Sequence, residues 1–179
     1  MRTFIAITFD DKTKDVIFEY GERFKSYTKA GSFTHKENIH LTVKFIGEVG
    51  EEAIPVIKKV MDAAVESADP FTLEFTDFGT FKTGPEHILW LGMKESEPLL
   101  KIRKKLDRGL IEAGIQGDDK PLKPHITLGR RVKLQTDLEE IKKVIKPNLK
   151  PYLVKSLTLM ESVRIQGKLT YIPVAQSAF

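Results

Sequence analysis

The chain has 179 residues and contains no cysteine. This absence excludes a disulfide-stapled scaffold, a thiolate nucleophile and a metal site with cysteine ligands. A chain of this length can bury a substantial hydrophobic core without covalent cross-links. Because a cysteine-free chain fits a reducing compartment, we expect the protein to be cytoplasmic.

Long hydrophobic runs are also missing. No apolar stretch approaches the ~18 residues that a membrane-spanning helix needs. The apolar run near the start, within MRTFIAITFDD, is too short for a secretory signal and has no cleavage site. Hydrophobic residues make up 41% of the chain and charged residues 30%, a balance typical of soluble globular proteins. We therefore expect no leader, no membrane association and a single domain over residues 1–179.

Several common catalytic signatures are absent as well. The sequence has no Walker A loop, no G-x-G-x-x-G and no H-E-x-x-H, and its histidines are not spaced as a local zinc site requires. We expect neither a metal nor another cofactor. The net charge of +4 favours an anionic partner such as nucleic acid or a phosphate ester, although many ordinary enzymes are this basic.

One short pattern is present twice. Residues 40–43 read HLTV and residues 125–128 read HITL, so each has the order His, apolar, Thr, apolar. Successive side chains of a strand point to opposite faces. In each motif the histidine and the threonine therefore share one face, while the apolar residues face the core. A single His-x-Thr is usually a cross-strand pair without function, but two copies in equivalent settings favour a site.

The apolar periodicity predicts the same series of elements around both motifs. After a first strand, the order helix, His-Thr strand, helix, strand, strand occurs twice, with the motifs 85 residues apart. This repeat indicates a degenerate internal duplication that gives two related lobes, and it would bring both motifs into one cleft. The predicted ranges are strand 2–9, helix 11–27, strand 39–46, helix 54–65, strands 71–76 and 87–93, a helix from Pro98 to Gly114, the second His-Thr strand from 125, a short helix over 137–145 capped by Thr136, and strands 152–163 and 168–179.

Two histidines across a cleft are suited to general acid–base catalysis. Their ordinary pKa of about 6.5 allows one ring, His40 or His125, to be neutral while the other is protonated. This division of roles suits phosphodiester cleavage, in which a nucleophile loses a proton and an ester oxygen gains one. The hydroxyl groups of Thr42 and Thr127 can donate hydrogen bonds to the non-bridging phosphate oxygens.

Two cations and two aromatic residues near the motifs are further candidates. Lys44 has the same strand parity as the first motif, so it could enter the cleft. Arg130 has the wrong parity, but Gly129 permits a bulge that would turn the guanidinium inward to bind phosphate. For both cations the alternative is a solvated charge at a strand end. Phe81 could stack on a base, but we favour the alternative that its side chain packs within its own loop. We assign Trp90 to the core.

The paired motif and its surroundings resemble the 2H phosphoesterase superfamily, which is defined by two His-x-Thr-x motifs. The likeness is greatest to the bacterial and archaeal RNA 2',3'-cyclic phosphodiesterases, also called 2'-5' RNA ligases. It covers almost the full chain and includes MRTFIAI, NIHLTVKFIGEV, ILWLG, KPHITLGR and ESVRIQGKLTYIPVAQSAF.

The resemblance implies an α+β, bilobal fold with two pseudo-symmetric lobes, whose antiparallel sheets line a central cleft and whose helices lie outside. It implies metal-independent hydrolysis of an RNA-terminal 2',3'-cyclic phosphate to a 2'-phosphomonoester, and reversible 2'-5' RNA ligation is also known in the family. By the family's pattern, His40 is the proton donor and His125 the acceptor. Thr42, Thr127 and Arg130 correspond to phosphate-binding positions.

The expected partners are RNA 3' ends, or small nucleotides, that carry a 2',3'-cyclic phosphate, and no obligate protein partner is predicted. One alternative is a phosphodiesterase of small cyclic nucleotides. Another is a non-catalytic nucleotide- or RNA-binding module, which would need neither a proton donor nor a base. Turnover of a 2',3'-cyclic nucleotide in EDTA distinguishes the enzyme from the binding module.

Overall fold

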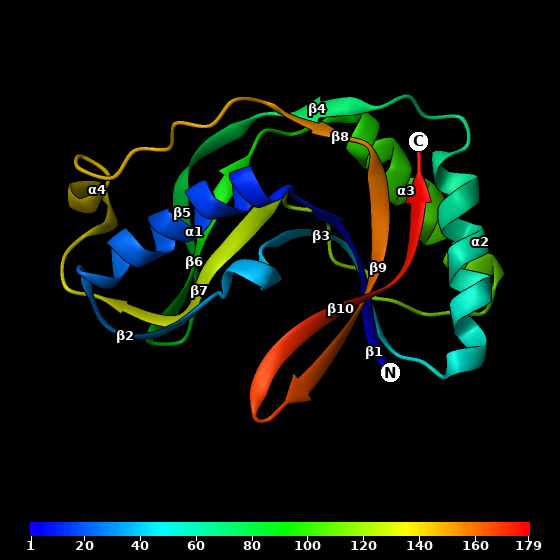
Figure 1. The fold of residues 1–179 in the computed structure, drawn as a ribbon, viewed down its shortest axis with the longest axis horizontal. Helices are drawn as coiled ribbons and strands as arrows, with labels where there is room; N and C mark the ends of the chain where they lie inside the picture. Colours follow the sequence, from blue (N-terminus) through cyan, green and yellow to red (C-terminus); the bar gives the residue numbers. More distant parts are fainter.

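The computed structural model describes residues 1–179 and contains two four-stranded antiparallel sheets and a small two-stranded one (Figure 1). The first sheet has the strand order β10 (Lys168–Ala178), β9 (Ser156–Ile165), β1 (Arg2–Thr8) and β3 (His40–Glu48). The second has the order β2 (Thr28–Phe33), β7 (His125–Leu134), β6 (Glu86–Met93) and β5 (Phe75–Thr83). The two-stranded sheet pairs β4 (Phe71–Leu73) with β8 (Tyr152–Val154).

The longer helices cover the two large sheets separately. Helix α1 (Asp11–Lys25) contacts β7 and β2 of the second sheet, whereas α2 (Ile54–Val65) and α3 (Glu97–Glu112) lie against the first. Shorter helical segments are η1 (Lys36–Asn38), η2 (Glu51–Ala53) and α4 (Leu138–Ile141). In Figure 1, α1 lies over the left half, α2 and α3 lie at the right, and the β9–β10 hairpin projects downward. The predicted bilobal α+β class is confirmed. The helices fall short of the length and apolarity that a membrane span requires.

Each large sheet contains one His-Thr strand, and both sheets combine strands from distant parts of the chain. The β5–β6 hairpin pairs with β7, and the β9–β10 hairpin pairs with β1. A cluster of 32 buried hydrophobic residues extends through both halves, so neither sheet has a core of its own. The predicted order of elements is observed, with β2 added and with two predicted strands divided: 71–76 into β4 and the start of β5, and 152–163 into β8 and β9. An internal duplication as the origin of this order remains a prediction.

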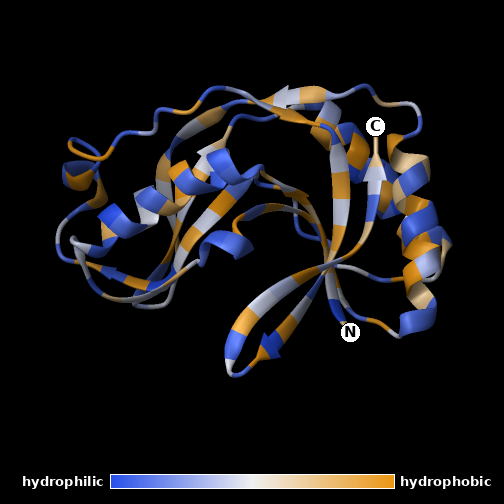
Figure 2. Cartoon of the chain, in the orientation of Figure 1, coloured by the Kyte–Doolittle hydropathy of each residue, from blue (hydrophilic) through white to orange (hydrophobic).

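Apolar spacing and capping residues explain where the helices form. The Asp10 carboxylate accepts a hydrogen bond from the Thr13 amide and caps α1, and Ser96 caps α3 in the same way. The predicted inward face of α3 is confirmed, because all four of its apolar positions are at most 1% exposed: Leu99, Ile102, Leu106 and Leu110. Figure 2 shows hydrophobic and hydrophilic bands alternating along the strands, as half-buried sheets require.

Two sequence predictions of local structure were wrong. Strand β2 was missed because residues 28–33, TKAGSF, are mostly exposed and lack apolar alternation; this edge strand pairs only with β7. The helix predicted over 137–145 is shortened to α4, a single turn. Thr136 does not cap it, since α4 begins directly after Asp137, whose side chain makes no capping hydrogen bond either.

A buried charge network joins α3 to β3 and to the loop that leads into β7. The Arg103 guanidinium, 8% exposed, donates to the Val43 carbonyl at 2.9 Å and to the Lys120 carbonyl at 3.0 Å. Its Nε also pairs with Asp107 at 2.9 Å, and the same carboxylate lies 2.6 Å from Nζ of Lys44. The network therefore connects β3 to the segment before the second motif.

We predict that Arg103→Met, which keeps the aliphatic stem, lowers the free energy of unfolding by about 3 kcal/mol. The substitution leaves the buried Val43 carbonyl without its donor and removes the guanidinium from its ion pair with the partly exposed Asp107. Urea denaturation measures this loss. The matched control is Arg108→Met on the same helix, where an exposed arginine pairs only with Glu112, and it should change stability little. Equal losses in the two variants would contradict the structural role of the network.

Candidate active site

His40 begins β3, and hydrogen bonds fix its ring. Nδ1 lies 2.7 Å from the carbonyl oxygen of Asn38, so in the neutral ring Nδ1–H donates to this acceptor. Nε2 is then the nitrogen that can exchange a proton, and it lies 2.9 Å from Oγ1 of Thr42. The histidine and the threonine of the first motif therefore share one face of the strand, as the sequence predicted.

Asn38 is itself held in place, and it thereby orients His40. The asparagine is 6% exposed, and its amide donates to the Leu169 carbonyl at 2.9 Å. Its side-chain oxygen accepts a hydrogen bond from the Tyr171 amide at 3.1 Å. The β9–β10 hairpin thus supports the carbonyl that determines which nitrogen of His40 is free.

His125 begins β7 with the same arrangement. Its Nδ1 lies 2.5 Å from the carbonyl oxygen of Lys123, which is again the residue two positions earlier in the chain. Each motif histidine is therefore left with Nε2 for proton exchange. Each histidine ring also makes an edge-on contact with an aromatic ring. The ring centres of His125 and Phe81 are 5.0 Å apart, and so are those of His40 and Tyr171.

Burial lowers the pKa of both histidines. For His40 this burial, between Phe4 and Tyr171, lowers the pKa to about 4, against the opposing effect of the hydrogen bond to Asn38. The charges of Arg130 and His125 lower it further. The pKa of His125 is also lowered, first by burial and then by Arg130, while its bond to the Lys123 carbonyl raises it. Both rings thus respond to the charge of Arg130.

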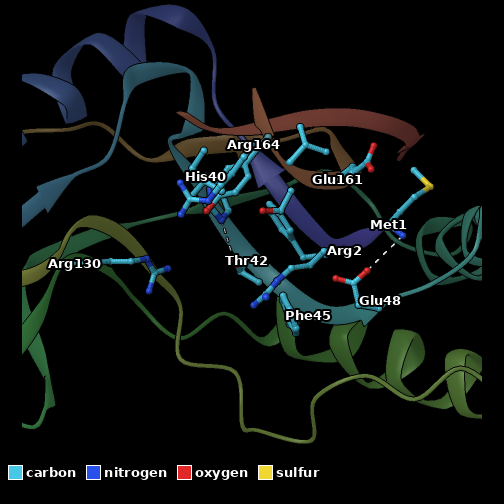
Figure 3. A pocket seen from close by; sticks show the side chains of 14 residues that line it. Met1, Arg2, His40, Thr42, Phe45, Glu48, Arg130, Glu161 and Arg164 are labelled. Carbon is cyan, nitrogen blue, oxygen red and sulfur yellow. Dashed lines mark hydrogen bonds and ion pairs between the residues drawn. The ribbon is translucent and has the colours of Figure 1, made fainter. Parts of the chain in front are cut away.

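A cavity of about 740 Å³ contains three of the five predicted site residues, namely His40, Thr42 and Arg130 (Figure 3). Figure 3 shows the Arg130 side chain extending from its strand toward Thr42. His125 and Thr127 do not line this cavity. They lie on β7, which contacts β3. A positive charge on His125 lowers the pKa of His40.

A bulge at Val43, the last residue of the first motif, explains why Lys44 takes neither of the two positions considered for it, the cleft or the solvated end of a strand. Ala6 of β1 pairs with Thr42, but Ile5 pairs with Lys44, so Val43 is an extra residue on β3. From this point the faces are exchanged. Lys44 is 5% exposed and points into the buried charge network, away from the cleft, while Phe45 faces the cavity.

A second bulge in β7 turns Arg130 toward the cavity. Trp90 of β6 pairs with Thr127, but its neighbour Leu89 pairs with Gly129, so Leu128 is an extra residue on β7 and the faces are exchanged before Arg130. One further extra residue lies between Gly129 and Val132, where Arg131 adopts a left-handed φ of 53°. The parity of a flat strand would bury Arg130, but its side chain is exposed and lines the cavity beside Thr42. The sequence had indicated that Gly129, directly before Arg130, permits a twist or a bulge.

The two aromatic candidates differ from their predicted roles. Trp90 does not belong to the buried core; it is half-buried and pairs with Thr127, and its indole lies over Gly79, where any Cβ would overlap the ring. Phe81 belongs to strand β5 rather than to a loop, and its ring contacts both Trp90 and His125. Together these rings form an aromatic surface beside the second motif.

Sequence reasoning missed the residues that surround His40. Asn38, Phe4 and Tyr171 were not predicted to belong to the site. Strand periodicity could have suggested Phe4, since it shares a face with Arg2 and Ala6. No local signal connects Tyr171 or Asn38 to His40, because the hairpin that brings Tyr171 to the site is distant in the chain.

The fold and the sequence were compared with known proteins. A model of the 2'-5' RNA ligase superfamily matches residues 15–165. A Thermotoga maritima protein named RNA 2',3'-cyclic phosphodiesterase is 33% identical over 131 residues, covering 73% of this chain and 70% of the relative. A Methanocaldococcus jannaschii protein of the same name is 32% identical over 151 residues, covering 80% and 83%.

Solved structures with the same fold cover nearly the whole chain. The apo form of E. coli LigT has a TM-score of 0.78 and 26% identity, with 99% of this chain and 96% of that chain covered. The same E. coli protein complexed with phosphate has a TM-score of 0.76 and 25% identity at the same coverage. The Thermus thermophilus protein TT0787, with a TM-score of 0.77, 23% identity and coverage of 99% and 97%, shares the fold.

The lowered pKa of His40 predicts a pH-dependent loss of stability. The folded pKa of about 4 lies below the ordinary 6.5, so the unfolded chain binds more protons as the pH falls through this window. Stability contributed by the neutral ring is present above pH 6.5 and is lost toward pH 4, by about 3 kcal/mol. Urea denaturation should show this extra loss in the wild type relative to His40→Gln. His35→Gln, which removes an exposed histidine, should keep the wild-type slope, and identical slopes in the wild type and His40→Gln would contradict the prediction.

Proposed function

The chain belongs to the 2'-5' RNA ligase superfamily, and we propose that it hydrolyses RNA-terminal 2',3'-cyclic phosphates to 2'-phosphomonoesters. The family membership supports an enzyme that hydrolyses phosphodiesters. The relatives named RNA 2',3'-cyclic phosphodiesterase support a cyclic phosphate at an RNA end as the substrate.

One observation carries the mechanism. Both motif histidines bind a backbone carbonyl through Nδ1, each from the residue two positions earlier, and both therefore keep Nε2 for proton exchange. Two rings that can hold the same tautomer, on strands that contact each other, fit the needs of paired acid–base catalysis. A module that only binds nucleotides has no use for this matched constraint.

In the proposed reaction, water attacks phosphorus opposite the departing 3'-oxygen. Nε2 of His125 takes a proton from the water, and Nε2 of His40 gives a proton to the 3'-oxygen, so the bond to the 2'-oxygen remains. The non-bridging oxygens accept hydrogen bonds from Thr42, Thr127 and Arg130. A 5'-hydroxyl group in place of water would give a 2'-5' linkage with the same groups, which is the basis for proposing ligation as a second, reversible outcome.

The acid role of His40 requires a proton that the free protein does not hold at neutral pH, because its pKa is about 4. Part of this lowering comes from the charge of Arg130. A bound phosphate oxygen offsets that charge and favours the imidazolium form. We therefore propose that substrate binding raises the pKa of His40 and thereby creates the acid.

The first test is turnover of an RNA oligomer that ends in a 2',3'-cyclic phosphate, in the presence of EDTA. We expect hydrolysis, with phosphorus NMR showing the phosphate retained on the 2'-oxygen. His40→Ala and His125→Ala should each lose most of the rate, and the double variant should lose little more, because the two rings act together. His87→Ala, outside the cavity, is the matched control. Binding without turnover would favour the non-catalytic module, and abolition by EDTA would refute the metal-free mechanism.

The second test is the pH profile. Because kcat/KM reports the free enzyme, its optimum should lie between about pH 4 and the ordinary histidine value of 6.5, since burial lowers the pKa of both rings. The optimum of kcat should lie at higher pH, because the bound phosphate raises the pKa of His40. In Arg130→Gln, both limbs of the kcat/KM profile should move upward. An optimum of kcat/KM above pH 7 would contradict these assignments.

A further inference from the structure

Strand β2 pairs with β7, the strand of the second motif, although it adds nothing to the buried core. None of its residues is buried, and it forms one edge of its sheet. Its last residue, Phe33, pairs with Gly129, and Ser32 pairs with Arg130. The end of β2 therefore lies beside the bulged part of β7, where the chain departs from regular strand geometry.

Thr34 follows directly after β2 and makes two hydrogen bonds to β7. Its amide donates to the Leu128 carbonyl at 2.9 Å, and its hydroxyl donates to the Thr127 carbonyl at 2.8 Å. In a regular strand, successive carbonyl groups point to opposite edges, so a single neighbouring residue does not reach both. Leu128 is the extra residue of the bulge. Thr34 therefore binds the carbonyl of the bulge residue together with that of the residue before it.

The same bulge decides which face of β7 carries Arg130. In a flat strand, strict alternation would place Arg130 on the core side, opposite to the histidine and the threonine of the motif. With Leu128 as an extra residue, Arg130 changes face, and its guanidinium group extends into the cavity (Figure 3). The carbonyl groups that Thr34 binds thus belong to the part of the chain that directs this cation.

The segment that begins at Thr34 leads on to the first motif. It passes through η1 to Asn38, whose carbonyl oxygen lies 2.7 Å from Nδ1 of His40. One short segment is therefore hydrogen-bonded to the second motif at its start and to the first motif at its end. The side chain of Thr34 contributes to the first of these connections, since its hydroxyl group reaches the Thr127 carbonyl.

We propose that Thr34 is a positioning residue of the active site: its hydroxyl group holds the bulge of β7 and thereby directs Arg130 toward the phosphate. This inference rests on the proposed function and adds to it a residue that does not line the cavity. The hydroxyl group is the specific part, because any residue except proline supplies the amide that binds Leu128. Valine has nearly the shape of threonine but no donor, so Thr34→Val removes this one hydrogen bond, whereas Thr34→Ser keeps it.

The first measurement is an NMR titration of the His40 and His125 rings in the free protein. The charge of Arg130 lowers the pKa of both rings, so displacement of its guanidinium group should raise both pKa values. Lys14 also lowers the pKa of His40, but it lies on α1 and not on β7. Thr34→Val should therefore raise both pKa values, by less than Arg130→Gln does, and Thr34→Ser should keep the wild-type values.

The second measurement is turnover of an RNA oligomer that ends in a 2',3'-cyclic phosphate. In Thr34→Val, kcat/KM should fall about tenfold, which is less than the roughly hundredfold that a misplacement of ~1 Å can cost. Thr34→Ser should restore most of the rate. The double variant Thr34→Val/Arg130→Gln should lose little more than Arg130→Gln alone, because the hydroxyl group acts through this cation.

Thr28→Val is the matched control, because Thr28 lies at the other end of β2 and its hydroxyl donates to the Phe24 carbonyl at 2.7 Å. It should leave both histidine pKa values and kcat/KM unchanged. Unchanged histidine pKa values in Thr34→Val, or an equal rise in Thr28→Val, would overturn this inference while leaving the proposed hydrolysis intact. Absence of turnover in the wild type would instead refute the proposed function, and the titration would still decide whether Thr34 directs Arg130.

Discussion

The buried guanidinium group of Arg103 joins the strand of the first motif to the loop that leads into the second. It donates to the Val43 carbonyl on the bulge of β3 and to the Lys120 carbonyl in the loop that leads to His125. Because the two motifs belong to different sheets, no strand-to-strand hydrogen bond links them. A buried charge with carbonyl acceptors on both sides imposes a geometry that apolar packing alone would leave free to slide. Burying a charge is costly, and here its hydrogen bonds connect the segments that carry the two catalytic candidates.

The two bulges explain why strand periodicity predicted the motifs but failed just beyond them. In each His-Thr strand the alternation of faces holds from the histidine to the threonine, so the shared faces of His40 with Thr42 and of His125 with Thr127 could be predicted from sequence. After Val43 the alternation is exchanged, which removes Lys44 from the cleft and brings Phe45 into it. Only in β7 does a glycine, Gly129, indicate the bulge in the sequence. In β3 no residue type signals it, because the exchange is stabilised by tertiary partners of Lys44 on α3 and its exit loop.

Other features could not be predicted because their cause lies in distant parts of the chain. The inward face of α3 was predictable, since the spacing of its leucines and isoleucine is a local property. The position of Trp90 was not, because the space for its indole is created by Gly79 on the neighbouring strand. In the same way, Asn38 orients His40 only because the β9–β10 hairpin supplies its partners. Sequence thus predicted the reacting groups, whereas the residues that orient them required the fold.

The aromatic surroundings of His40 connect the fold to the proposed chemistry. Phe4 and Tyr171 remove water from the ring, and this desolvation lowers its pKa to about 4. Such a ring is a poor acid in the empty site, since it holds almost no proton at neutral pH. The positive charge of Arg130 lowers the pKa in the empty site, yet the same charge attracts the phosphate that offsets it. Desolvation also strengthens the attraction between an imidazolium ion and the bound phosphate. The arrangement therefore makes protonation of His40 depend on the substrate, so that binding and acid catalysis are coupled through one cation and two aromatic rings.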